Sequence, residues 1–228
     1  MVKSFTHIPL TTPLPEMFAD TTENGRFYYT PEGNVYPSIT TVLGAQSKEH
    51  LEAWRERIGE EEAFRQTTHA CDRGTNLHAV LESYLKNEDL IFPDDPKSKV
   101  KIMFQRMKRP LAANVDNIVI QEAPLYSDAL KIAGRCDLIA EWKNVLSIID
   151  FKGSNKAKKT EWIQSYFMQA TGYSLMFEER TGIKIDKIVI LMSGENDFSC
   201  QVFEETRDKY VQPLKDAINY YNATHPSK

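Results

Sequence analysis

Two aspartates and a lysine near the middle of the chain have the spacing of a hydrolytic centre. Asp150 follows Asp137 by thirteen positions, and Lys152 follows Asp150 by two. Hard carboxylate oxygens favour Mg²⁺ or Mn²⁺, and such ions polarise a phosphoryl oxygen and lower the pKa of a bound water. An ammonium beside them can stabilise an oxyanion or orient that water. The set therefore predicts metal-assisted phosphodiester hydrolysis, with Asp137, Asp150 and Lys152 as the catalytic residues.

The strands that carry these residues read as a hairpin. Residues 131–140 and 145–151 are β-branched and apolar, and a short polar connection at 141–144 joins them. A turn centred on Lys143-Asn144 makes Asp137 face Asp150, where two like charges destabilise the pair unless a cation lies between them. The alternating period of a strand puts Lys152 on the face of Asp150. The alternative is that both aspartates are unrelated residues near strand ends and the lysine is a solvated charge.

A histidine upstream adds a nitrogen ligand to this set. Thr75 suits a helix N-cap, and residues 76–86 follow with helical apolar spacing. His78 and Glu82 are four apart, so they share a face of that helix. A neutral imidazole is a common metal ligand, although a lone helical histidine is more often a partly buried structural residue. Its position before the aspartates and the lysine favours the metal role.

The ordered motifs resemble those of RecB-type nucleases of the PD-(D/E)xK superfamily. They are GTNLHAVLESYL at 74–85, GRCDLIA at 134–140, IIDFK at 148–152 and QATGY at 169–173. Two further segments, together with the first motif extended to RGTNLHAVLESYL at 73–85, are similar to the mitochondrial genome maintenance exonucleases and their bacteriophage relatives: PSITTVL at 37–43 and WRERIGEEEAF at 54–64. The resemblance covers about residues 36 to 192.

This resemblance implies an α/β fold with a restriction-endonuclease-like core, a mixed central sheet flanked by helices, and an N-terminal helical elaboration. The implied metal ligands are His78, Asp137, Asp150 and the Phe151 carbonyl. Lys152 would be the catalytic lysine, and Gln169 and Tyr173 would support the active site and contact DNA. Mg²⁺ would be the cofactor, with Mn²⁺ able to replace it. The implied activity is a DNA exonuclease that prefers single-stranded ends, because residues 36–78 resemble the part that restricts access in the mitochondrial relatives.

Two other functions remain open. A structure-selective endonuclease could use the same centre, and a non-catalytic DNA-binding protein is the alternative from another class. The intact set of Asp137, Asp150 and Lys152 favours an enzyme over the latter.

The remaining elements build one α/β domain of residues 1–228, with an elaboration at 1–72 and a core at 73–228. A hairpin of residues 26–29 and 34–36 turns at 31–33, and residues 40–71 read as helical. The inner face of that helical region is expected at Leu51, Trp54, Ile58 and Phe64.

Further along, residues 94–114 read as a helix and residues 117–125 as a strand. Glu122 on that strand either approaches the metal or is a structural or water-mediated partner. A helix capped by Thr160 ends at Gly182, strands follow at 183–192 and 198–203, and residues 207–222 form a closing helix.

The net charge of −4 does not exclude a nucleic-acid partner, because phosphate binding depends on local clusters. Lys156, Lys158 and Lys159 follow the second aspartate strand, and we expect them to bind the DNA backbone together with Thr75. A second basic run reads instead as a solvated face; it consists of Lys97, Lys99, Lys101, Arg106, Lys108 and Arg109.

The cysteines and the hydropathy of the sequence indicate in which compartment we expect the protein. No C-x2-C pair occurs among Cys71, Cys136 and Cys200. The sequence therefore predicts neither an iron–sulfur cluster nor a zinc site. Cys136 reads as buried core. Unpaired cysteines suit a reducing compartment, and the sequence has no apolar run of the roughly 18–20 residues that a membrane span needs. Without a signal peptide or transit peptide pattern, we expect a cytoplasmic protein of a bacterium or a phage-infected cell.

Overall fold

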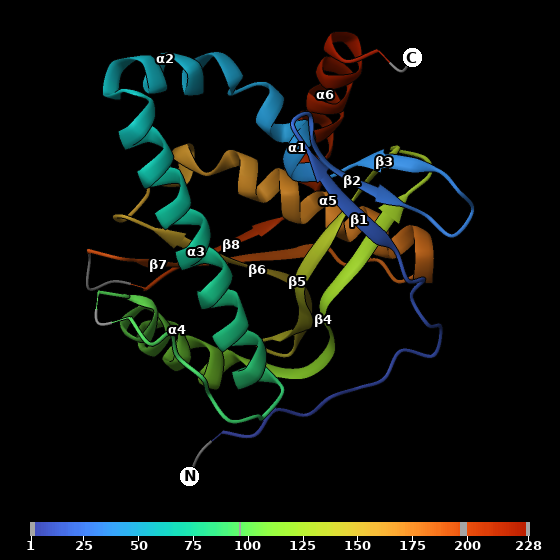
Figure 1. Ribbon diagram of the computed structural model, residues 1–228. Helices are drawn as coiled ribbons and strands as arrows, with labels where there is room; N and C mark the ends of the chain where they lie inside the picture. The colour runs from blue at the N-terminus through green and yellow to red at the C-terminus, as the bar shows by residue number, and fades with distance from the viewer. Residues whose placement is uncertain (1–2, 96, 197–199, 227–228) are drawn as a thin grey trace.

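A five-stranded mixed sheet forms the centre of the computed structural model, which describes residues 3–95, 97–196 and 200–226. The strand order is β4-β5-β6-β7-β8; β6 and β7 are parallel and the other neighbours antiparallel. The strands are β4 Val115–Ser127, β5 Ile132–Trp142, β6 Val145–Ser154, β7 Lys187–Gly194 and β8 Cys200–Thr206. The predicted α/β fold with a mixed central sheet flanked by helices is confirmed (Figure 1).

Helices cover both faces of this sheet (Figure 1). On one face lie α3, Glu60–Leu85, and α4, Val100–Asn114. On the other lie α1, Ile39–Ala45, α5, Gln164–Thr181, and α6, Asp208–Thr224, with a 3-10 turn at Thr160–Trp162 before α5. Successive strand residues point to opposite faces, so Ile148 packs under α5 and Ile149 under α3 and α4.

A second, three-stranded antiparallel sheet precedes the helices. It contains β1, Phe18–Thr22, β2, Gly25–Tyr29, and β3, Val35–Pro37. The predicted hairpin is therefore confirmed as β2 and β3. Its inner side contacts the core through Tyr36, whose ring stacks on that of Tyr126 with 6.4 Å between the centroids. The Tyr36 hydroxyl also donates a hydrogen bond to Asp128 over 2.7 Å.

The helical region before residue 73 differs from the prediction. Residues 39–85 form α1, α2 and α3, with α2 spanning Lys48–Ile58. Gly59, with φ 87°, separates α2 from α3. The long helix α3 then runs through residue 75, so Thr75 is not an N-cap and the boundary at residue 72 falls inside a helix.

The predicted inner face of this region is wrong. Leu51 is 49% exposed and Phe64 is 74% exposed, and no described residue of α2 is buried. The helix α2 projects beyond the central sheet instead of covering it (Figure 1). The apolar spacing of these residues identifies a helix, while its burial depends on which element lies opposite.

Other boundaries moved by a few residues. The helix predicted at 94–114 begins at Val100, and the strand predicted at 183–192 begins at Lys187. The strand predicted at 198–203 is β8, although residues 198 and 199 lie outside the described residues. Gly182 ends α5 as predicted, in the left-handed conformation, whereas the predicted cap is wrong: Thr160 lies in the 3-10 turn and α5 begins at Gln164. No helix in the described part of the chain is long and apolar enough to cross a membrane.

The hairpin between β5 and β6 has the predicted register. Trp142 pairs with Val145, leaving a two-residue turn at Lys143 and Asn144. Both turn residues have positive φ, 53° and 64°, as a type I′ turn requires. Because this turn suits the right-handed twist of the strands, it fixes which residues of β5 and β6 oppose each other.

We predict that the turn tolerates glycine but not valine at position 144. A β-branched residue at φ 64° is strained, so Asn144→Val should lower the free energy of unfolding by about 1–2 kcal/mol. Asn144→Gly keeps the positive φ accessible and should stay within about 0.5 kcal/mol of the wild type. Urea unfolding followed by circular dichroism measures both, and equal stability of the two variants would contradict the turn assignment.

Candidate active site

Three carboxylates lie in one row across β4, β5 and β6. In β4 and β5, Gln121 pairs with Leu138 and Ala123 with Cys136. Glu122 and Asp137, which lie between these pairs, are therefore opposite each other. The pairing of β5 with β6 ends at Leu138 and Ile149, one residue before Asp137 and Asp150. The row forms because the sheet places three non-neighbouring parts of the sequence side by side.

The strands β5 and β6 separate at this row. Cys136 joins the apolar cluster under α5, whereas Leu138 joins the cluster under α3 and α4. In a regular strand both would point to one face, so β5 is irregular at Asp137. The Asp137 Oδ2 atom accepts a hydrogen bond from the Phe151 N–H over 2.7 Å. The Asp137 carboxylate thus takes the place of a backbone carbonyl as hydrogen-bond acceptor, and β5 and β6 diverge at this point. We call this divergence the fork.

A histidine and a glutamate complete the polar lining of the fork. His78 on α3 has Nδ1 3.4 Å from Glu122 Oε1 and 3.6 Å from Asp137 Oδ1. The candidate ligand atoms of these three residues lie within 4.8 Å of one another. Glu122 has φ 46°, a conformation that a residue other than glycine rarely adopts and that is often found at functional sites. Glu122 thus lies beside two candidate ligands and also contacts His78, so its roles as a metal ligand and as a structural partner both stay predictions.

The backbone of Phe151 contributes to the same group. Its carbonyl accepts a hydrogen bond from His78 Nε2 over 3.0 Å. This contact fixes the imidazole so that Nδ1 faces the carboxylates. The carbonyl therefore orients a candidate ligand here, and its own role as a metal ligand stays a prediction.

Asp150 and Lys152 form a buried ion pair beside the fork. The Lys152 Nζ atom lies 2.6 Å from Asp150 Oδ2 and 5.2 Å from the centroid of the Tyr166 ring. Asp150 is fully buried, and its Oδ1 atom has no hydrogen-bond partner among the described residues. A buried carboxylate oxygen without a partner is unfavourable. The group whose ligand atoms lie close enough for a hard divalent cation consists of His78, Glu122 and Asp137; Asp150 is not part of it, and its role as a ligand stays a prediction.

Burial and mutual repulsion disturb the ionisation of these groups. Burial raises the pKa of Asp150 to about 6, with Lys152 opposing and Asp137 adding to the rise. Burial also raises the pKa of Asp137. Burial by itself would lower the pKa of His78, but Asp137 and Glu122 outweigh it and raise that pKa to about 9. An added cation would favour the charged carboxylates and the neutral imidazole.

The cavity at the fork brings together most of the predicted site residues. It has a volume of about 450 Å³, and its wall includes Thr75, His78, Glu122, Asp137, Lys152, Gln169 and Tyr173. Arg26 and Arg135 also line it and were not among the predicted residues. Arg135 lies within the GRCDLIA segment, close to Asp137 in the sequence. This closeness to a predicted site residue could have identified it.

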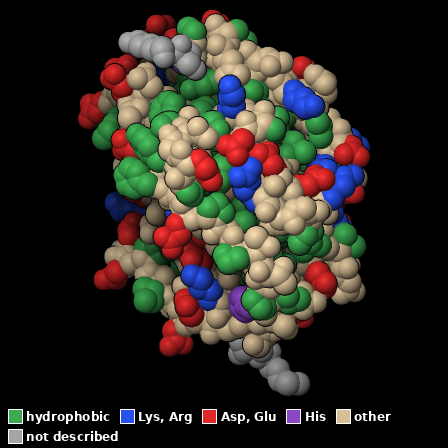
Figure 2. Space-filling view, turned by 90° about the vertical axis from the view of Figure 1, so that its right-hand side faces the viewer, with side chains coloured by type: hydrophobic (Ala, Val, Ile, Leu, Met, Phe, Trp, Pro, Cys, Tyr) green, Lys and Arg blue, Asp and Glu red, His purple; other side chains and the backbone are tan. Residues whose placement is uncertain are grey.

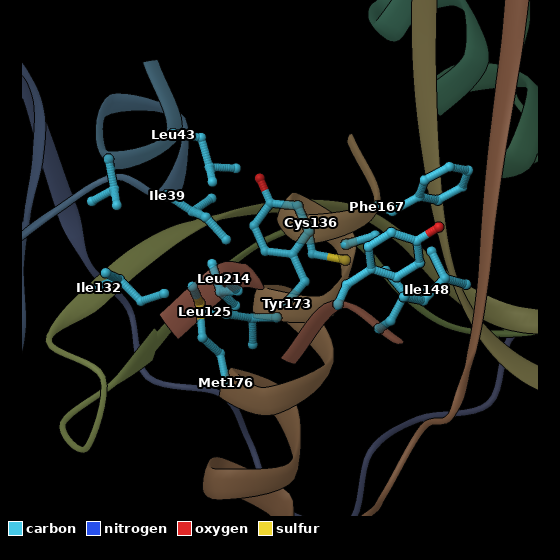
Figure 3. Packing of buried hydrophobic residues seen from close by; sticks show 14 of the residues in the cluster. Ile39, Leu43, Leu125, Ile132, Cys136, Ile148, Phe167, Tyr173, Met176 and Leu214 are labelled. Carbon is cyan, nitrogen blue, oxygen red and sulfur yellow. The ribbon is translucent and has the colours of Figure 1, made fainter. Parts of the chain in front are cut away.

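Gln169 and Tyr173 are a hydrogen-bonded pair at the floor of the cavity. Gln169 Nε2 donates to the Tyr173 hydroxyl over 2.9 Å, and both side chains are buried. Tyr173 lies among apolar side chains beside Ile39 and Cys136 (Figure 3). A β-carbon added to Gly134 would lie only 2.7 Å from the Tyr173 ring, so a glycine is needed there. The pair supports the strand that carries Asp137.

The predicted DNA-binding lysines lie beyond the other side of α3. Lys156 and Lys158 line a second pocket, about 620 Å³ in volume, together with Arg73, Trp54 and Tyr166. Lys159 is instead exposed, with its Nζ 5.4 Å from the centroid of the Trp162 ring. Thr75 faces the first cavity, so the four residues predicted to contact DNA are divided between the two pockets.

The fold and the residues in the fork are consistent with an α/β nuclease-like core, and sequence comparison supports a nuclease relationship. The chain is 29% identical over 142 residues to the human protein named mitochondrial genome maintenance exonuclease 1, covering 59% of this chain and 40% of that protein. The mouse protein of the same name is 26% identical over 133 residues, covering 55% and 39%. This chain thus spans about two fifths of the length of these curated relatives.

Two other comparisons complete these findings. No family model matches the chain. A solved structure described as "Crystal structure of SSO0001" aligns with 82% of this chain and 76% of that chain, with a TM-score of 0.43 and 17% identity.

We predict that Mg²⁺ stabilises the protein more strongly near pH 9 than near pH 6.5. The pKa of His78 is raised from 6.5 to about 9, so a proton must leave the imidazole before it can bind an ion. In the metal-free protein, this raised pKa stabilises the fold below pH 6.5, and the contribution is lost as the pH rises through 9. Thermal unfolding with and without Mg²⁺ measures the increment at each pH.

His78→Gln is the matched control for this experiment. It removes the titration of the imidazole and should reduce the difference between the two pH values to the part set by Asp137 and Asp150, whose pKa values burial also raises. An increment in the wild type that is the same at both pH values would contradict a role for His78 in holding the ion.

Proposed function

We propose that this protein is a divalent-metal-dependent deoxyribonuclease that hydrolyses phosphodiester bonds from single-stranded DNA ends. The observation that carries the proposal is the fork between β5 and β6, where Asp137 and Lys152 line one cavity and the fully buried Asp150 pairs with Lys152 behind its wall. The relatives in human and mouse are named exonucleases. We further propose Mg²⁺ as the natural ion, with Mn²⁺ able to replace it.

Each residue of the fork has a proposed part in the reaction. Asp137, Asp150, His78 and Glu122 would hold the ion, with the Phe151 carbonyl beside them. When bound, the ion polarises a phosphoryl oxygen and lowers the pKa of a bound water. Asp150 and Asp137 raise the pKa of Lys152 despite its burial, so its ammonium stays charged. That ammonium can stabilise the negative charge that develops on the phosphate or orient the attacking water.

The position of the two pockets supports a single-stranded substrate. The cavity at the fork contains Lys152, and the second pocket contains Gly153 and Tyr166, the ring over which Lys152 lies. Residues of α3 line both pockets, and Leu51 and Trp54 of α2 line the second. In this proposal a single strand runs along α3 from one pocket to the other. Residues 1–72 would act as the elaboration that restricts access, and the lysines of the second pocket would contact the backbone.

We predict that Asp150→Asn abolishes cleavage without abolishing binding. The amide keeps the size of the side chain but removes the charge that pairs with Lys152 and the ion. Cleavage of end-labelled single-stranded DNA in Mg²⁺ should fall by at least about 10³-fold, equivalent to about 4 kcal/mol of activation free energy. Fluorescence anisotropy with the same oligonucleotide should give a dissociation constant within a few-fold of the wild type.

Asp216→Asn on the exposed side of α6 removes the same charge far from the fork and serves as the control. Its activity should equal that of the wild type. Undiminished, metal-dependent cleavage by Asp150→Asn would show that the active centre lies elsewhere.

A requirement for DNA ends separates the proposed exonuclease from an endonuclease with the same centre. We predict that closed circular single-stranded DNA survives an enzyme concentration that degrades its linearised form. If α3 and α5 enclose the path to Lys152, only a DNA strand with a free end can enter between them. Gel electrophoresis of the two substrates over time is the measurement, and linear products from the circle would establish endonuclease activity.

A further inference from the structure

Helix α4 and the residues before it carry a run of positive charge without any acidic residue. Residues 97–114 contain six lysines and arginines and no aspartate or glutamate. Elsewhere the charges are mixed: on the face shown in Figure 2, basic and acidic side chains are interspersed. A sequence with a net charge of −4 thus concentrates cations on one element. Such a cluster attracts an anionic partner.

The buried side of α4 fixes where this charge lies. Met103, Phe104, Met107 and Leu111 pack on the sheet. Arg106 Nη1 donates a hydrogen bond to the Gly194 carbonyl at the end of β7 over 2.5 Å. A β-carbon on Gly153, the residue after Lys152, would lie 3.1 Å from Met103 Cε. The helix therefore borders the strand ends next to the catalytic lysine.

The two flanks of α4 differ in what their cations contact. Lys101 and Lys108 lie over the rings of Phe92 and Tyr84, at 5.7 and 5.6 Å from the centroids. Helical periodicity places Lys99 on the other flank with Arg106, and Arg109 on the outward face between the two flanks. Lys99 and Arg109 are both exposed, and neither forms an ion pair with any described residue.

The flank with Lys99 and Arg106 faces the edge at which the chain leaves the catalytic strand. Ser154 at the end of β6 pairs with Gly194, the residue that Arg106 contacts. Lys156 and Lys158 follow Ser154 closely in the chain. Among the described residues, the acidic Glu195 lies at this edge, and Arg73 binds it over 2.6 Å. Its charge is therefore already paired and does not offset that of Lys156 and Lys158.

We propose that Lys99 and Arg109 extend the lysines at 156 and 158 into a surface that binds the sugar-phosphate backbone of DNA outside the active-site cavity. The inference rests on the proposed function, because it assigns this surface to the same nucleic acid that reaches the fork. Contacts to backbone phosphates are independent of base sequence and release bound counterions. The surface therefore increases affinity for long strands and leaves the chemistry at Lys152 unchanged.

The test compares short and long oligonucleotides at several salt concentrations. Binding of single strands of about 6 and about 30 nucleotides is measured by anisotropy in the Asp150→Asn background, which prevents turnover. Lys99→Gln with Arg109→Gln should weaken binding of the long strand several-fold. The slope of log K against log salt should become shallower by about 1.4, for two lost contacts to a single strand. Binding of the short strand should not change.

The matched control is Lys131→Gln with Lys215→Gln, which removes the same charge at two exposed positions away from α4. Equal affinities and slopes for the two double variants would overturn the α4 surface while leaving the proposed function intact. If the Asp150→Asn protein binds neither oligonucleotide, both the surface and the proposed function are wrong.

Discussion

The hydrogen bond from the Phe151 N–H to the Asp137 carboxylate is the contact on which the rest of the site depends. It replaces a backbone pairing between β5 and β6, so the two strands separate beyond Leu138 and Ile149. The separation opens a polar space inside an otherwise apolar sheet. In a continuous ladder, Asp137 and Asp150 would repel each other across paired strands. The fork instead places the carboxylates around a polar space whose ligand set is compatible with a divalent cation.

The surrounding elements stabilise charges that an apolar core would otherwise disfavour. Burial raises the pKa of Asp150, and the neighbouring Lys152 opposes that rise. His78 reaches the fork because α3 crosses the strands on the face opposite α5, and the Phe151 carbonyl holds its ring in place. From the other face, Gln169 and Tyr173 on α5 support β5. Both layers of helices therefore contribute to one small cavity.

Local signals in the sequence were sufficient for much of the fold. Two turn residues that tolerate positive φ gave the register of β5 and β6, because a two-residue turn leaves the strands no other pairing. Gly182 marked the end of α5 for a similar reason. Burial was harder to predict: Leu51 and Phe64 have core-like spacing but are exposed. The periodicity of a helix identifies its apolar side without showing whether another element covers it.

The sequence by itself determined which residues of the hairpin oppose each other, and so brought Asp137, Asp150 and Lys152 together. These relations act over short distances along the chain, where turn geometry and strand period leave little freedom. Only the tertiary structure decided that Glu122 lies beside His78 and Asp137, that Thr75 lies inside a continuous helix and that Arg106 of α4 reaches the end of β7. Those relations depend on strand order and on how helices pack on the sheet, which are set by burial of the whole apolar surface.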